Sequence, residues 1–501
     1  MTPAQYTPEE PISSIATALA PAALGIVRVS GKGCIELVSK VFSRPKALLE
    51  AAGNTLVYGW ILDCPVKPDN DNGVSSSGLT RGSRIDEVML AVYRAPKSFT
   101  GEDMVEIFCH GGPAVVMAVQ NLMLKSGFRQ ANRGEYTFRA FINGKTDLTR
   151  AEAVKEIIDS HTDVSRSHAA GRLAGALFEE IDSIKKLIID TLAAIEVEIE
   201  YPEDEETIAD SFDRADIEEA ASRLQALVDS WRGEKLYQDG ARVVLAGRTN
   251  AGKSSLFNAI LKEERAIVSD IEGTTRDWLE SWASINGIPV RLFDTAGLRE
   301  TSDQIEAQGV EISRSLVHDA DVVLYLVDGS QGLNDEDRQF IENCKEPLIL
   351  VYTKADKLDC RVKPDNDTTA MSSSDSTEMS SSGLTRGSRP IQSFISSKTG
   401  AGLSDLFSKI FDLLTADLGT SGAGGSTERA QAGLGSARQK EAVASALESV
   451  RHALISADDN YTLDAVVQDL EDSLDALGEV TGDVTPDDVL GSIFANFCVG
   501  K

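Results

Sequence analysis

A glycine-rich nonapeptide, GRTNAGKSS, has the residue types needed to bind the phosphates of a nucleoside triphosphate. It fits the pattern GxxxxGK[ST] and follows a strand-like apolar run, Val243 to Ala246. Gly247 and Gly252 let successive backbone N–H groups converge on phosphate oxygens. Lys253 supplies a positive charge for the β and γ phosphates, and the Ser254 hydroxyl is suited to bind Mg²⁺. The nonapeptide therefore predicts a nucleoside triphosphate site.

Two later segments indicate that the base is guanine. An apolar run, Leu348 to Tyr352, leads into the tetrapeptide TKAD, which ends at Asp356. Guanine presents its N1–H and N2–H₂ donors together, so one carboxylate accepts from both, whereas adenine lacks this pair. Thr353 stands where GTPases usually have asparagine, and it keeps a hydroxyl but loses the amide. The last guanine-contact loop is expected at Ser396, Ser397 and Lys398.

Residues for metal binding and hydrolysis are expected between the phosphate-binding nonapeptide and the guanine-contact segments. Asp294 and Gly297 begin and end a DxxG pattern, in which the carboxylate reaches Mg²⁺ through water and the glycine amide senses the γ-phosphate. Thr275 is expected to complete the Mg²⁺ coordination, and an ordinary polar loop is the alternative. Leu298 stands where many GTPases carry a glutamine that orients the attacking water. Glu306 is the candidate replacement, with a solvent-facing helix acid as the alternative.

Alternating strands and helices must position these motifs, and they predict a doubly wound sheet with its ligand at the carboxyl ends of the strands. The expected strands are Val243–Ala246, Ile288–Phe293, Val322–Val327, Leu348–Tyr352 and Ile391–Ile395. Apolar periodicity predicts helical stretches over 149–199 and 464–497. The nucleotide-binding module is therefore interpreted as an insertion in one helical domain, with independent helical domains as the alternative.

The segments GRTNAGKSS, AIVSDIEGTTRDWL, DTAGLRE and FCVGK together resemble the MnmE (TrmE) family of tRNA modification GTPases. Upstream, GIVRVSG, APKSFTGEDMVEIFCHGGP and FRAFINGKTDLTRAEAV resemble the folate-binding domain of the family and the start of its helical domain. The resemblance implies a multidomain α/β and α+β protein. It has an N-terminal α+β folate-binding-like domain, a helical bundle domain and an inserted Ras-like doubly wound P-loop GTPase domain.

The expected boundaries follow from these segments. They are 1–144 for the folate-binding and dimerisation domain, 145–237 and 416–501 for the two parts of the helical domain, and 238–415 for the GTPase domain.

The family also implies an activity and partners. The chain is expected to be a homodimeric, K⁺-stimulated and Mg²⁺-dependent GTPase of the cytoplasm. With a flavin-dependent GidA-type (MnmG) protein it would form a heterotetramer that adds a carboxymethylaminomethyl group at C5 of the wobble uridine of certain tRNAs. A 5-formyl- or methylene-tetrahydrofolate supplies the one-carbon unit. The alternative is an Era-like regulatory GTPase in ribosome or RNA assembly, whose N-terminal domain serves only for dimerisation.

The resemblance carries individual roles onto this chain. Mg²⁺ would be held by Ser254 and Thr275. K⁺, in the place where other GTPases insert an arginine finger, would be held by Asn250, Ser269, Ile271 and Thr274. The residues implied to contact GTP are Asn250, Ala251, Gly252, Lys253, Ser254, Ser255, Ser269, Thr274, Thr275, Asp294, Gly297, Thr353, Lys354, Asp356, Ser396, Ser397 and Lys398. The catalytic candidates are Glu306, Thr275 and Cys498.

Folate contacts are implied at Arg28, Glu106, Lys145 and Lys501, which suit a ligand with carboxylates and paired N–H donors. Two departures from the family pattern lie near this pocket. Ala20 to Leu24 replace a Gly/Arg-rich loop, and Arg133 takes the place of a proline before Gly134. The folate site is therefore less firmly predicted than the GTP site. Cys498 would act as a thiolate, and a buried structural cysteine is the alternative.

Composition limits the remaining possibilities. A net charge of −30 argues against a broad nucleic-acid footprint, so tRNA contacts are expected to be local or shared with a basic partner. The six cysteines form no CxxC pair, which disfavours a disulfide framework or a zinc site. A repeated segment at about 62–84 and 358–389 is interpreted as inserted sequence in two surface loops, and a shared binding partner is the alternative.

Overall fold

The computed structural model describes residues 10–63, 84–200, 213–263, 279–294, 315–357, 390–416, 432–458 and 463–500. The chain divides into two compact units. One comprises residues 1–155, 181–213 and 448–501, and the other comprises residues 156–180 and 214–447. Within the described residues, no helix is long and apolar enough to cross a membrane. The four predicted domain ranges stay predictions.

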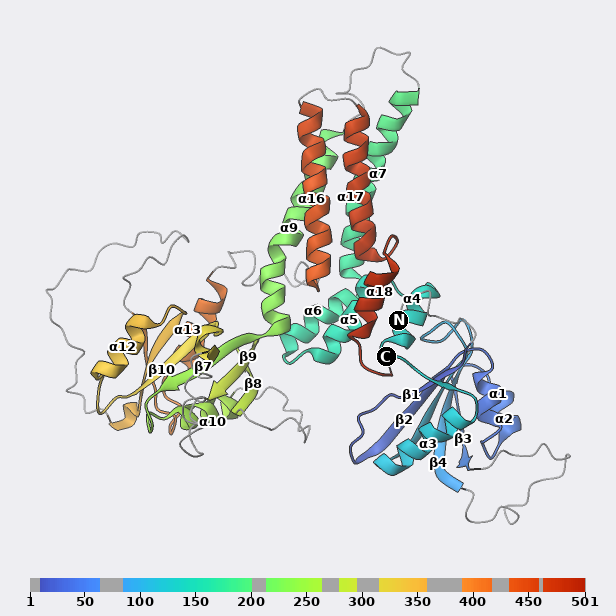
Figure 1. Ribbon diagram of the computed structural model, residues 1–501, viewed down its shortest axis with the longest axis horizontal. Coiled ribbons are helices and arrows are strands. Elements are labelled where there is room, and N and C mark those ends of the chain that lie inside the picture. The colour runs from blue at the N-terminus through green and yellow to red at the C-terminus, as the bar shows by residue number, and fades with distance from the viewer. Residues whose placement is uncertain are drawn as a thin grey trace. The chain divides into compact units, whose positions relative to one another are not determined.

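The first unit contains a six-stranded sheet in the order β3-β4-β5-β2-β1-β6 (Figure 1). Neighbouring strands are antiparallel except for β1 and β6, which are parallel. The strands are β1 Ile12–Ile15, β2 Ala22–Ser30, β3 Thr55–Leu62, β4 Arg84–Tyr93, β5 Met104–Gly111 and β6 Arg129–Gln130. Helices α1 Cys34–Ser39, α2 Pro45–Leu49 and α3 Pro113–Lys125 share one apolar core with the strands.

Alternation along β2 explains which side chains reach that core. Val27 and Val29 are fully buried in it, whereas Arg28 between them points to the opposite face. On β5, Val105 and Ile107 are buried in the same way, and Glu106 lies between them. The sheet therefore presents Arg28 and Glu106 on the face away from its helices.

Helices complete the first unit. They are α4 Glu135–Ile142, the first part of α5 Leu148–Asp159, the later part of α7 Ala176–Glu200, the end of α16 Ala437–Asp458, α17 Leu463–Thr481 and α18 Asp487–Ala495. An apolar cluster joins α4, α5 and α18, and in it the rings of Phe138 and Phe494 pack edge to face with centroids 5.4 Å apart.

The second unit contains a six-stranded sheet in the order β12-β11-β10-β7-β9-β8. Only β8 is antiparallel to its neighbour. The elements are β7 Ala241–Gly247, α10 Lys253–Glu263, β8 Leu279–Ile285, β9 Ile288–Asp294, β10 Val322–Asp328, α12 Asp335–Asn343, β11 Leu348–Thr353, the 3₁₀ turn η3 Ala355–Lys357, β12 Ile391–Phe394 and α13 Leu403–Thr415.

Both faces of this sheet are covered. Val243 and Leu245 of β7 join a core with α10 and α13, and Val244 and Ala246 join a second core on the α12 side. A strand buried on both faces reads as a continuous apolar run, which is why β7 was recognisable in the sequence. The predicted doubly wound α/β domain is confirmed, as is the multidomain α/β and α+β fold class.

The helical part of the second unit comprises the end of α5, α6 Asp163–Ala174, the start of α7, α9 Arg214–Asp239 and the start of α16. The periodicity predicted over 149–199 corresponds to α5, α6 and α7. Sequence periodicity had not identified α9 and α16 as helices. Most of each repeated insert lies outside the described residues, at 64–83 and 358–389.

Candidate functional site

The phosphate-binding loop connects β7 to α10 and depends on left-handed backbone conformations. Gly247 has φ 131°, and a Cβ there would lie 2.4 Å from the carbonyl oxygen of Leu326. Gly252 has φ 99°. Asn250 adopts φ 66°, which is uncommon for a residue with a side chain. This backbone leads into the start of α10, where helix N–H groups favour a bound anion.

Lys253 and Ser254 begin α10 and are anchored from the loop and from β9. The Lys253 ammonium donates to the carbonyl oxygens of Gly247, at 2.7 Å, and Arg248, at 2.9 Å. The Ser254 hydroxyl donates to Asp294 Oδ2 at 2.9 Å. The structure therefore brings together two of the three residues predicted to act at Mg²⁺, while Thr275 lies outside the described residues. A hydroxyl with a carboxylate is the oxygen chemistry that this ion prefers.

The guanine-contact loops lie together at the ends of β11 and β12. The Ser396 hydroxyl donates to Asp356 Oδ1 at 2.8 Å, and Ser396 is buried. One oxygen of the predicted base-selecting carboxylate is thus oriented by the neighbouring loop. Ser397 is half-buried and Lys398 is exposed beside it.

Thr353 connects the base loop to the phosphate loop. Its hydroxyl lies 2.7 Å from the carbonyl oxygen of Ala251 and 3.2 Å from that of Val327, and the residue is 2 % exposed. Where GTPases usually have asparagine, this chain therefore has a threonine whose single hydrogen-bond donor is used within the protein.

Several predicted residues lie outside the described residues, so their roles stay predictions. They are Ser269, Ile271, Thr274, Thr275, Gly297, Leu298, Glu306 and Lys501.

A second candidate site lies on the face of the N-terminal sheet opposite helices α1, α2 and α3. Arg28 and Glu106 are cross-strand neighbours, joined by bonds of 2.9 and 2.7 Å to the same carboxylate oxygen. The Arg28 guanidinium also donates to the carbonyl oxygen of Gly500 at 2.9 Å, and it lies 6.0 Å from the ring centroid of Phe99. Lys145 donates to the carbonyl oxygen of Pro96 at 3.0 Å. Of the four predicted folate residues, Arg28 and Glu106 thus lie on this face of the sheet, and Lys145 contacts the loop that follows β4.

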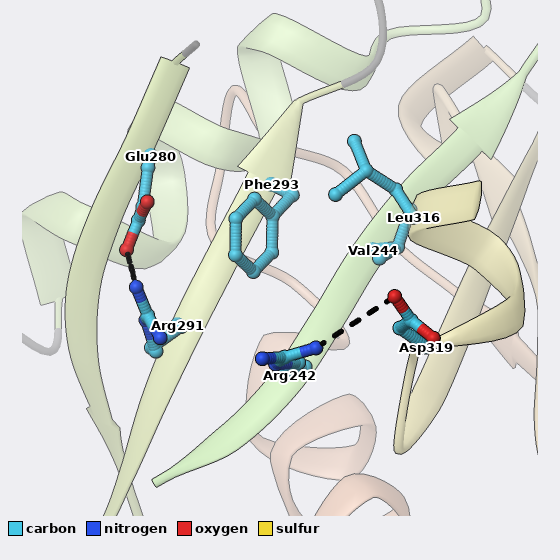
Figure 2. A pocket seen from close by; sticks show the side chains of 7 residues that line it. All are labelled: Arg242, Val244, Glu280, Arg291, Phe293, Leu316 and Asp319. Carbon is cyan, nitrogen blue, oxygen red and sulfur yellow. Dashed lines mark hydrogen bonds and ion pairs between the residues drawn. The ribbon is translucent and has the colours of Figure 1, made fainter. Parts of the chain in front are cut away.

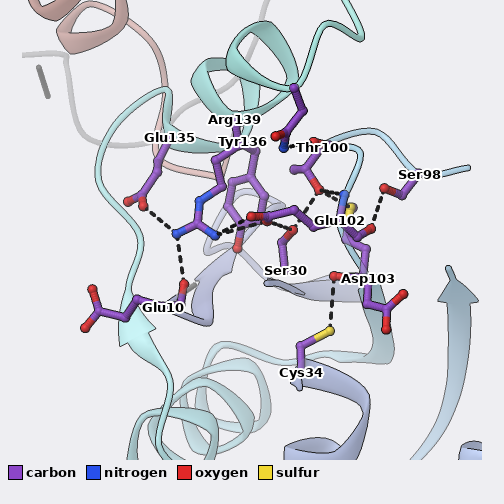
Figure 3. A network of polar contacts seen from close by, with 12 residues as sticks. Glu10, Ser30, Cys34, Ser98, Thr100, Glu102, Asp103, Glu135, Tyr136 and Arg139 are labelled. Carbon is purple, nitrogen blue, oxygen red and sulfur yellow. Dashed lines mark hydrogen bonds and ion pairs between the residues drawn. The ribbon is translucent and has the colours of Figure 1, made fainter. Parts of the chain in front are cut away.

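A buried polar network holds that loop, and sequence reasoning missed it (Figure 3). Arg139 has no exposed side-chain area, and its guanidinium contacts both Glu102 oxygens at 3.1 and 3.0 Å and Glu135 at 3.0 Å. Burial raises the pKa of Glu135, but hydrogen bonds from Arg129, the Asn132 amide and Arg139 lower it overall. The only available signal was an arginine within an apolar helix, which by itself reads as a surface charge.

The C-terminal tail contacts the same domain. The Gly134 amide donates to the carbonyl oxygen of Cys498 at 3.4 Å, and Arg133 forms an antiparallel bridge with Val499. Phe497 is buried, but Cys498 is exposed. The alternative of a buried structural cysteine is therefore wrong, while a catalytic role stays a prediction.

A shallow hollow of about 250 Å³ in the second unit is separate from these sites (Figure 2). Its lining consists of Arg242, Val244, Glu280, Arg291, Phe293, Leu316 and Asp319. Arg291 pairs with Glu280 at 2.5 Å and Arg242 pairs with Asp319 at 4.0 Å, so both cations of the hollow have a carboxylate partner within its lining. No predicted site residue lines it, and we do not assign it a ligand.

Comparisons with known proteins cover nearly the whole chain. The family model of the GTP-binding protein TrmE N-terminus matches residues 11–145, and the model of the MnmE helical domain matches residues 148–498. A protein of Treponema denticola named tRNA modification GTPase MnmE is 49% identical over 502 residues, covering 99% of each chain. Proteins of the same name from Treponema pallidum and Borrelia turicatae are 43% and 39% identical, at 99% and 98% coverage of each chain.

Among solved structures, Era of Aquifex aeolicus is 24% identical and covers 34% of this chain and 56% of its own, with a TM-score of 0.24. The G domain of the Thermotoga maritima FeoB transporter is 26% identical and covers 34% of this chain and 98% of its own, with a TM-score of 0.22. The fold assignment rests instead on the strand order described above.

Proposed function

This chain belongs to the family of MnmE (TrmE) tRNA modification GTPases, and from that membership we propose a specific reaction for it. It hydrolyses GTP while acting with a flavin-dependent GidA-type (MnmG) partner. Together they add a carboxymethylaminomethyl group at C5 of the wobble uridine of certain tRNAs. The observation that carries the GTPase half is the contact between the phosphate loop and the loop that contains Asp356, which the buried Thr353 hydroxyl makes with the carbonyl oxygen of Ala251.

The phosphate half of the site supports hydrolysis by positioning and charge. The amides of the loop and the start of α10 bind phosphate oxygens, and Lys253 balances the charge of the β and γ phosphates. Ser254 and Thr275 would hold Mg²⁺, which neutralises charge that develops on the phosphates. Asp294, which accepts from the Ser254 hydroxyl at 2.9 Å, would reach the ion through water. Asn250 would hold K⁺ in the place of an arginine finger, with Ser269, Ile271 and Thr274, and Glu306 would orient water.

The base half selects guanine. Asp356 accepts from the paired N–H donors of the base, and the Ser396 hydroxyl keeps the carboxylate in one orientation. A base without those two donors cannot make these charge-assisted hydrogen bonds to the carboxylate and therefore binds more weakly.

The N-terminal sheet supplies a place for the one-carbon donor, a 5-formyl- or methylene-tetrahydrofolate. We propose that Arg28, Glu106 and Lys145, together with Lys501, bind it. The Arg28–Glu106 pair at 2.7 Å orients the guanidinium for a carboxylate-bearing ligand. Cys498 is exposed on the tail that reaches this sheet, and we propose it as a reactive thiol.

The Era-like alternative has less support. Its central feature is an N-terminal domain without a folate role, whereas residues 11–145 match the TrmE N-terminal model. The proposal also includes a homodimer and a heterotetramer with the partner, in which the partner supplies much of the tRNA affinity. The chain carries a net charge of −30, and phosphate neutralisation requires basic groups.

The test is nucleotide selection by the Asp356→Asn variant. The asparagine amide offers a donor where guanine presents its own N2–H₂ donors, whereas xanthine has a carbonyl oxygen there that accepts a hydrogen bond. GTP affinity should therefore fall about 100-fold or more, and XTP affinity should rise. Binding is measured with fluorescent nucleotide analogues, and Asp335→Asn, an exposed acid of the same domain, is the control. A wild-type protein that binds no guanine nucleotide would sink the proposed function. If the variant still prefers GTP over XTP as the wild type does, only the proposed role of Asp356 would be refuted.

A further inference from the structure

Asp328 is the last residue of β10 and is not among the predicted site residues. Its Oδ2 accepts from the Lys354 ammonium at 2.5 Å. Its Oδ1 accepts from the Ser330 amide at 3.0 Å and from the Ser330 hydroxyl at 2.6 Å. These bonds from Lys354 and Ser330 lower the pKa of Asp328 to about 2, so the carboxylate is ionised throughout the physiological range. Both of its oxygens are therefore committed.

Lys354 reaches Asp328 from an unusual backbone conformation. Its φ is 59°, in the left-handed region that residues with a long side chain seldom occupy. The surrounding structure must hold such a conformation, and the ion pair with Asp328 is a contact that does so. The Lys354 ammonium also lies 3.4 Å from the carbonyl oxygen of Asn250 in the phosphate loop.

Two successive residues of the base loop thus contact two successive carbonyl groups of the phosphate loop. Thr353 contacts Ala251, and Lys354 contacts Asn250. Thr353 is fixed by its own hydroxyl, whereas Lys354 has a long flexible side chain. A flexible ammonium keeps one position only where an acceptor holds it, and Asp328 is that acceptor.

We infer that Asp328 is a positioning residue for the bound nucleotide: it holds Lys354 against the phosphate loop and so maintains one spacing between base loop and phosphate loop. The inference rests on the proposed GTP site. A nucleotide contacts both loops at once, so it stays bound only while their spacing matches its own length. Without Asp328 the two loops separate more readily, and the nucleotide dissociates faster, whichever purine it carries.

The experiment measures the dissociation rate of a fluorescent GDP analogue from full-length protein. Asp328→Asn should raise this rate about tenfold, because it removes a charge-assisted hydrogen bond. Lys354→Met should raise it to a similar extent, and the double variant should be no faster than Lys354→Met alone. The preference for GTP over XTP should stay as in the wild type, since Asp356 is intact.

The matched control is Asp405→Asn on α13. Asp405 has the same two kinds of partner, Lys409 at 2.5 Å and the Ser393 hydroxyl at 3.0 Å, but neither partner is a predicted site residue. A dissociation rate for Asp328→Asn equal to that of this control would overturn the inference. Multiplicative effects in the double variant would also overturn it, because Asp328 would then act without Lys354.

Two measurements keep the outcome clear. Ser330→Ala retains the ion pair and removes one donor to Asp328, so it should raise the dissociation rate only about twofold, even where Asp328→Asn fails to fold. No rise for Ser330→Ala and no rise for Lys354→Met would together contradict the inference. Failure of the wild-type protein to bind guanine nucleotides would instead refute the proposed function.

Discussion

At the scale of single residues, Thr353 shows how a departure from a motif is accommodated. Asparagine at this position would have both a donor and an acceptor, whereas the threonine hydroxyl has one hydrogen. That hydroxyl lies within hydrogen-bond distance of the Ala251 and Val327 carbonyl oxygens, in a residue that is 2 % exposed. We interpret Thr353 as a connection between loops, which leaves recognition of the base to Asp356.

Replacing Thr353 with valine tests this interpretation. Valine keeps the shape but leaves buried carbonyl oxygens without their donor, at a cost of about 1–3 kcal/mol. We expect guanine nucleotides to dissociate about tenfold faster, with selection of GTP over XTP unchanged. Stopped-flow fluorescence measures the rate. Thr353→Ser retains the hydroxyl and should behave almost as the wild type, so a serine variant as impaired as the valine variant would contradict the interpretation.

At the scale of secondary-structure elements, Arg172 joins the helices of the second unit. It lies on α6 and is 1 % exposed, with Glu156 of α5 at 2.7 Å and Glu234 of α9 at 2.8 Å. It also donates to the carbonyl oxygen of Gly433 at 3.2 Å. Because α9 leads directly into β7, this cluster supports the helix that precedes the phosphate loop. His161, between α5 and α6, stacks on Trp282 of β8 with ring centroids 3.9 Å apart.

Arg172→Met should destabilise the second unit by about 3–5 kcal/mol, because the buried Glu234 and the largely buried Glu156 lose their shared cation. Chemical denaturation followed by circular dichroism measures the loss at pH 7. The control is Arg166→Met on the same helix, whose ion pair with Asp163 is exposed and should contribute little. Equal effects of the two variants would contradict the assigned role.

The pH dependence has a definite sign. Burial raises the pKa of Glu234, but the hydrogen bond from His168 and the charge of Arg172 lower it overall, below the ordinary value of 4.5. A carboxyl group with a lowered folded-state pKa stabilises the protein above its unfolded pKa, and this contribution disappears as the pH falls through the folded value. The stability difference between wild type and Arg172→Met should therefore shrink below about pH 4.5. A stability difference between the two proteins that grows as the pH falls would contradict this assignment.

At the scale of the whole molecule, the two ends of the chain build one site. Arg28 donates to the carbonyl oxygen of Gly500, 472 positions away in sequence. Gly500 has φ 99°, and a Cβ there would lie 2.6 Å from the carbonyl oxygen of Ile15. The tail therefore fits against β1 only with glycine at this position.

Gly500→Val should displace the tail and weaken the proposed binding of 5-formyltetrahydrofolate by about tenfold, as loss of one charge-assisted contact would. Isothermal titration calorimetry measures the affinity. Val499→Ala, which changes an exposed neighbour, is the control. Unaltered folate binding in Gly500→Val would exclude the tail from the site.

The sequence by itself determined the features whose residues are adjacent. The phosphate loop, the Asp356 loop and the strands β7, β9, β10 and β11 were recognisable, because local spacing sets backbone shape and a strand buried on both faces needs mainly apolar residues. The fifth predicted strand, β12, is mostly exposed, and this reason does not apply to it. Helices α9 and α16 were not recognised, since charged and small residues interrupt their apolar spacing. Only packing against other elements stabilises such helices.

Tertiary structure alone decided which charged groups meet. Arg139, Arg172 and Asp328 each read as ordinary surface charges in the sequence, yet each is buried between partners from other elements. An ion pair depends on the distance between two side chains, and for residues far apart in the chain the strand order and helix packing fix that distance. For the same reason, only the folded chain could place the C-terminal tail beside Arg28 and the Lys354 ammonium beside the phosphate loop.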